Sequence, residues 1–76
     1  MTKRELIRAI QITEAAAWKT LGEMKDAFGV DSDQSARARS AWSSLFDLRE
    51  QLGVSGLPVA ELIQLNLLPT RKPEAA

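Results

Sequence analysis

Apolar residues recur every three or four positions through the first third of the chain, which is the spacing of one face of an α-helix. The series is Ile7, Ile10, Ala17, Leu21, Met24 and Phe28, interrupted by Glu14. Before it, Thr2 and Glu5 have the T-x-x-E spacing of a capping box. After it, Gly29 suits the left-handed position that commonly ends a helix. The pattern predicts a helix over about residues 3–28.

A second series with the same spacing follows after a few polar residues. Asp31, Ser32 and Asp33 are each competent to cap a helix start. The apolar positions are Ala38, Ala41, Leu45, Leu48 and Leu52, with Trp42 and Phe46 widening the stripe. Gly53 repeats the ending seen at Gly29. We expect a second helix over about residues 32–52.

The short connection of about four residues between these helices predicts an antiparallel hairpin, because short helix–helix loops join antiparallel neighbours. Reflection about the loop places Leu21 opposite Trp42, Trp18 opposite Leu45, and Glu14 opposite Arg49. A carboxylate in an apolar seam is costly unless it is paired. We interpret Glu14 and Arg49 as an ion pair that fixes the register, within one hairpin or across a dimer. The alternative is that Glu14 is a polar hook for a partner.

Residues 55–68 have a different pattern, with apolar side chains on nearly all sides. Pro58 suits a helix start, and Asn66 with Pro69 marks an end, so a short helix is expected over about residues 58–66. Such a helix must be covered on more than one side. We expect residues 1–69 to form one helical domain and residues 70–76 to be a disordered tail.

The expected fold is therefore all-α: an antiparallel two-helix hairpin plus a short C-terminal third helix, assembling into a dimeric helical bundle. A chain of 76 residues buries a small core and usually needs a disulfide, a metal or a partner copy. It has no cysteine and no histidine, which argues against disulfides and a metal site. Association with a second copy is the remaining source of stability.

Charge and composition narrow the function classes. Ten basic and ten acidic residues balance, so nucleic acid is not an expected partner. No apolar run approaches the roughly 20 residues that span a bilayer, and the absence of cysteine fits a reducing cytoplasm. Without His, Cys or Tyr, few groups remain for proton transfer or nucleophilic attack. We expect no enzyme activity and no cofactor, and a role as an accessory protein of a bacterium or phage.

The candidate contact residues are the large apolar side chains that one hairpin would leave uncovered. Trp18, Trp42 and Phe46 supply most of the aromatic area, either as packing in the core or subunit interface or as an exposed recognition patch. Ile12 points away from the seam and would pack under the C-terminal segment or against another chain. From that segment we add Leu57, Leu62, Ile63 and Leu65. The partner expected is a second copy, with another protein as the alternative.

The plan of residues 2–53 resembles that of the small Rop-type RNA-binding hairpins, which also begin T-K-x-E and turn through an acidic loop. The resemblance implies an alternative function, RNA binding by a dimeric hairpin, with Lys3 and Lys25 on the corresponding face. The other positions on that face are Ile10, Glu14 and Trp18. They depart from an RNA-binding surface, because Glu14 places an acid where phosphate contacts would be wanted. We take this likeness as one of architecture.

Overall fold

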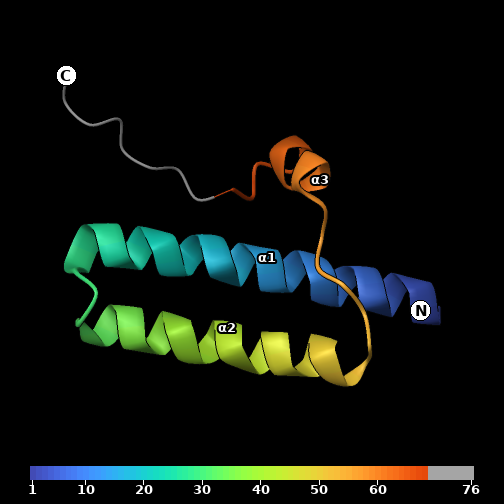
Figure 1. The fold of residues 1–76 in the computed structure, drawn as a ribbon, viewed down its shortest axis with the longest axis horizontal. Helices are drawn as coiled ribbons and strands as arrows, with labels where there is room; N and C mark the ends of the chain where they lie inside the picture. Colours follow the sequence, from blue (N-terminus) through green and yellow to red (C-terminus); the bar gives the residue numbers. More distant parts are fainter. Residues whose placement is uncertain (69–76) are drawn as a thin grey trace.

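A computed structural model describes residues 1–68 as three helices: α1 (Lys3–Phe28), α2 (Asp33–Gln51) and α3 (Val59–Gln64). The two long helices lie side by side and antiparallel, and α3 lies beside α1 after the chain has crossed over that helix (Figure 1). No strand occurs within the described part of the chain. The all-α hairpin with a short third helix is confirmed. The expected tail, residues 70–76, and Pro69 lie outside the described residues.

The start of α1 has one of the two bonds of the predicted capping box, because the Glu5 carboxylate meets the Thr2 hydroxyl instead of the Thr2 backbone N–H. The Thr2 hydroxyl oxygen accepts a hydrogen bond from the Glu5 backbone N–H at 3.2 Å, and the Thr2 hydroxyl lies 3.1 Å from the Glu5 carboxylate. At the other end the Gly29 N–H donates to the Lys25 carbonyl at 2.9 Å. Gly29 has φ 94° and ψ 157°, which is not the left-handed helical conformation we expected but a region that essentially only glycine occupies.

A pair of serines organises the turn into α2. Ser32 is the N-cap, and its hydroxyl oxygen accepts from the Ser35 N–H at 3.1 Å, which selects one of the three candidate caps. The Ser35 hydroxyl donates to the Gly29 carbonyl at 2.7 Å, and Ser35 has no exposed surface. One buried hydroxyl thus connects the first turn of α2 to the end of α1.

The two later helices end in the same way. Gly53 (φ 68°) donates to the Glu50 carbonyl, and the next N–H donates back to Arg49. Asn66 (φ 55°) does the same for α3, donating to the Ile63 carbonyl. These are Schellman motifs, in which a residue with positive φ satisfies the last carbonyls of a helix. The helix α3 is shorter than the expected 58–66, because Pro58 is its extended N-cap (ψ 154°).

Asparagine substitutions at Gly29 and Gly53 should have different effects on stability, because the two glycines have different backbone conformations. Asparagine tolerates the left-handed helical region, as Asn66 shows, but not the backbone of Gly29. We expect Gly29→Asn to lower the free energy of unfolding by about 1–3 kcal/mol and Gly53→Asn to cost well under about 1 kcal/mol. An added Cβ meets no atom within 4 Å at either position, so the difference measures the backbone alone. Urea unfolding followed by circular dichroism is the measurement, and equal costs would contradict this account.

The face that α2 turns toward α1 differs from the one we expected. Ala41, Leu48 and Leu52 were assigned to the seam between the helices, but all three are exposed. The buried or half-buried positions of α2 are Ser35, Ala38, Trp42, Ser43, Leu45, Phe46 and Arg49. The apolar stripe of α2 is too wide for one neighbour to cover. The side that carries Trp42 and Phe46, together with Ala38 and Leu45, is covered, and the side that carries Ala41, Leu48 and Leu52 is left open.

Residues 54–68, here called the C-terminal arm, cover one side of the hairpin. Arg8 on α1 and Glu61 on α3 form an ion pair at 2.8 Å, and the Gln11 side chain donates to the Ser55 carbonyl at 2.7 Å. Further along α1, Lys19 donates to the Asn66 carbonyl at 3.0 Å. Three side chains of α1 therefore fasten the arm along one side of that helix. Among residues 1–68, Leu21 is the only hydrophobic residue that is buried.

Candidate functional site

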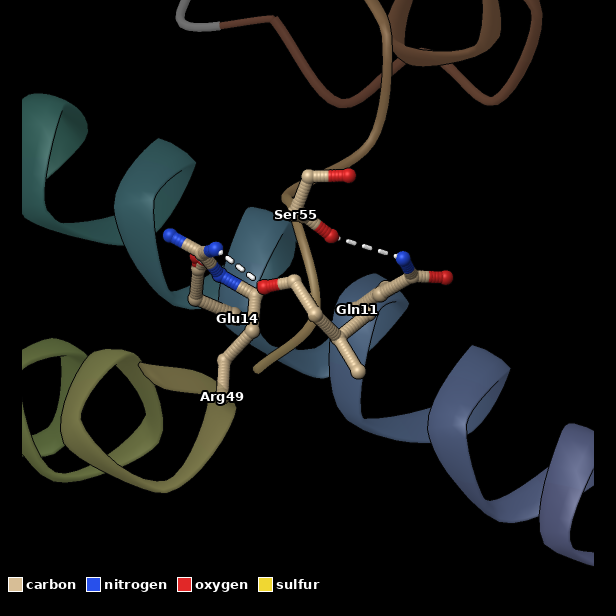
Figure 2. Close-up of polar contacts among 5 residues, drawn as sticks. Gln11, Glu14, Arg49 and Ser55 are labelled. Carbon is tan, nitrogen blue, oxygen red and sulfur yellow. Dashed lines mark hydrogen bonds and ion pairs between the residues drawn. The ribbon is translucent and has the colours of Figure 1, made fainter. Parts of the chain in front are cut away.

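An ion pair joins the middle of α1 to the last turn of α2. Arg49 Nε donates to both carboxylate oxygens of Glu14, at 2.8 and 3.2 Å, and Figure 2 shows the two side chains meeting between the helices. Both side chains are only 11–12% exposed. The sequence predicted this pairing from the reflection about the loop, and the structure places it within one chain. Its function in fixing register remains a prediction.

The same guanidinium also holds the start of the arm. Arg49 Nη1 donates to the Val54 carbonyl at 2.7 Å. A side-chain carbon built on Gly56 would lie 3.8 Å from both Arg49 Cζ and a Glu14 oxygen, so the backbone of the arm passes directly over the ion pair. The Gln11–Ser55 hydrogen bond lies beside it in Figure 2. The ion pair is therefore a junction of both long helices and the arm.

An aromatic row adjoins the ion pair. The ring centroids of Trp18 and Trp42 are 4.8 Å apart, and those of Trp42 and Phe46 are 5.2 Å apart, both at tilted angles. These distances lie in the range of favourable ring contacts. Arg49 Cζ lies 5.1 Å from the centre of the Phe46 ring, within reach of a cation–π interaction. The charged junction and the aromatic row thus form one continuous cluster.

A pocket of about 240 Å³ lies between this cluster and the arm. The helices contribute Glu14, Ala15, Trp18, Trp42, Phe46 and Arg49, and the arm contributes Leu57, Leu62, Leu67 and Leu68. The lining is apolar apart from the ion pair, whose charges face each other. Such a surface binds apolar groups by removing them from water. Among residues 1–68 no group of three or more potential metal ligands occurs.

The predicted contact residues fall into three places. Five of them, Trp18, Trp42, Phe46, Leu57 and Leu62, line the pocket. Trp18 is still 45% exposed, so the aromatic row is packed on one side and open on another. Ile12 is half-buried. Ile63 and Leu65 lie outside the pocket with 61% and 42% exposure. The proposed contact set is thus not one continuous patch.

Sequence reasoning missed one feature of the turn before α2 and one feature of the pocket. Ser35 has no apolar character, and only its three-residue spacing from Ser32 indicated a local role. Leu67 and Leu68 were predicted to lie beyond α3, yet they complete the wall of the pocket. Their position follows from the left-handed turn at Asn66, which reverses the chain toward the hairpin.

The residues of the Rop-type resemblance are spread along α1. Lys3 and Lys25 lie near opposite ends of the helix, and Glu14 between them is engaged by Arg49. Within residues 1–68 no helix combines the length and the apolar character needed to cross a membrane. Compared with known proteins, the chain matches no family model, no curated protein and no solved structure.

Proposed function

We propose that this chain is a non-catalytic interaction protein that works as a homodimer of helical hairpins. One observation supports this above all: among residues 1–68 a single hydrophobic residue is buried, whereas eleven large hydrophobic side chains are exposed. Burying one large apolar side chain is worth roughly 1.5–3 kcal/mol, so leaving many of them in water forfeits much of the available stability. A second copy that covered part of this surface would recover it.

The entropy cost of folding also supports association. Ordering each residue costs roughly 1–2 kcal/mol of backbone entropy, and hydrophobic burial must offset that sum. The covered cluster around Trp42 and Leu21 is small for a chain of this length. The arm adds to the cover of the hairpin but also exposes Val59 and Ile63, each more than 60% accessible. Association is the source of further burial that requires no disulfide or metal. We also propose a cytoplasmic location, in keeping with the absence of cysteine.

Sedimentation equilibrium and light scattering over a wide concentration range test the proposal. We expect a particle of twice the 8.4 kDa chain mass, and a melting temperature that rises with protein concentration because only the folded state associates. A monomer at all concentrations with a concentration-independent melting temperature would contradict the proposal. Retention on immobilised RNA at low salt, lost as salt rises, would favour the Rop-type alternative instead.

A further inference from the structure

The side of the hairpin that faces away from the arm carries a continuous strip without charge. On α1 it consists of Leu6, Ile10, Thr13, Ala17, Thr20 and Met24, and on α2 of Gln34, Ala38, Ala41, Leu45, Leu48 and Leu52. Both series have alternating steps of four and three residues, the spacing of a helix face that packs against other helices. We call these twelve residues the open strip. None of the chain's twenty charged residues belongs to it.

The contacts of the arm show that the open strip lies on the other side of α1. The arm is fastened through Arg8, Gln11 and Lys19, and the pocket adds Ala15 and Trp18. The strip residues at positions 10, 13, 17 and 20 each follow one of these by two positions. Two residues along an α-helix correspond to a rotation of about 200°. The strip therefore lies on the side of α1 opposite the arm.

Exposure confirms that nothing within residues 1–68 covers the large residues at one end of the strip. Leu6 is 48% exposed, Leu48 41% and Leu52 44%. Ile10 and Leu45 beside them are half-buried, as expected for residues at the edge of the contact between the helices. An apolar face of this kind is costly in water unless another molecule covers it.

We propose that the open strip packs against the open strip of a second copy, forming a four-helix bundle. This inference rests on the proposed homodimer and names its contact face. The strip is two helices wide and 18 residue steps long, which corresponds to about 20 Å by 27 Å. Treated as a flat rectangle, it has an area on the order of 500 Å². A biological interface should bury at least about 1,000 Å² in total, or about 500 Å² per partner, so the strip reaches the smallest area that a specific dimer needs.

The order of side-chain sizes sets the orientation of the two copies. Large residues (Leu6, Ile10, Leu48 and Leu52) occupy the end away from the loop. Small residues (Ala17, Thr20, Ala38 and Ala41) lie nearer the loop. Close packing requires large residues opposite small ones. An antiparallel dimer, whose two-fold axis crosses the middle of the strip, satisfies this requirement there, because it places Ile10 over Thr20 of the other copy and Leu48 over Ala38.

Charge substitutions on two exposed surfaces test the face. Leu48→Glu introduces a charge into the open strip, and Ile63→Glu introduces the same charge on the outer side of α3, where the parent side chain is exposed to a similar or greater extent. We expect Leu48→Glu to weaken dimerisation at least tenfold with the helical circular dichroism retained, and Ile63→Glu to leave it within about twofold. The reverse pattern would overturn the open strip while leaving the homodimer intact. A monomeric parent protein would instead refute the homodimer itself.

Single cysteines provide a second readout that does not depend on destabilisation, since the natural chain has no cysteine. With a short thiol-reactive cross-linker we expect Ala41→Cys, near the centre of the strip, to give covalent dimers, and Val59→Cys on α3 to give none. In this antiparallel arrangement the two copies of position 6 lie about 27 Å apart along the bundle. Leu6→Cys should therefore not cross-link to itself. Efficient cross-linking of Leu6→Cys would overturn the orientation, and cross-linking through position 59 alone would overturn the face.

Discussion

Replacing Glu14 with leucine is expected to lower the free energy of unfolding by about 3 kcal/mol. The change removes both acceptors of Arg49 Nε and leaves a guanidinium that is 12% exposed without its counter-charge. Breaking one side of a buried pair typically costs about 3–5 kcal/mol, because the remaining charge is desolvated and unpaired. The lower end applies here, since Arg49 keeps its hydrogen bond to the Val54 carbonyl. Urea unfolding at a fixed protein concentration measures the loss.

Two comparison variants separate the pair from general surface effects. Arg8→Ala removes the ion pair between Arg8 and Glu61, whose side chains are 45% and 33% exposed, and should cost at most about 1 kcal/mol. The double change Glu14→Leu with Arg49→Met replaces both charges by apolar groups. It should recover most of the stability lost in the single variant. If Glu14→Leu changes neither the melting temperature nor the oligomer mass, the pair has no role in stability or register.

The pairing of Glu14 with Arg49 could be predicted because it depends on a local feature of the sequence, the short loop between the two helices. A short loop fixes which positions of two antiparallel helices face each other, so Glu14 and Arg49 could be matched from their distances to the loop. The bounds of α1 were predictable for the same reason, because Thr2 with Glu5 and Gly29 act within one turn of each end. The Ser32 cap was one of three open choices. Hydrogen bonds within the turn, from Ser32 and Ser35 to the Gly29 carbonyl, accompany the choice of Ser32, and the cap spacing alone does not predict them.

The covered face of α2 could not be predicted in this way. Its apolar stripe includes Trp42 with Phe46 on one side and Leu48 with Leu52 on the other. The periodicity of the sequence does not indicate which of these two sides packs against α1. The choice depends on the arm, which packs against the aromatic half from residues far along the chain. The heptad pattern nevertheless identified real apolar positions. The exposed ones, Ala41, Leu48 and Leu52, are the positions that the proposed dimer would cover.

Replacing Trp42 with alanine is expected to cost about 3 kcal/mol of unfolding free energy. Trp42 is the central ring of the aromatic row, in contact with Trp18 on one side and Phe46 on the other. Loss of a large aromatic residue from a core costs about 3–5 kcal/mol, and the half-buried position of Trp42 places it at the lower end of that range. The missing ring would also enlarge the pocket under the arm. Protease cleavage near residues 55–58 should therefore accelerate along with the loss of stability.

Trp18→Ala is the matched control, because it removes the same type of side chain from the end of the row. Trp18 is 45% exposed and has one ring contact instead of two, so its removal should cost about 1–2 kcal/mol. The ring–ring coupling would appear in the double variant, whose cost should be smaller than the sum of the single costs because both lose the same contact. A larger cost for Trp18 than for Trp42 would mean that the exposed ring is covered in solution. That covering would have to come from a second molecule on the arm side, and the open strip would then not be the principal contact face.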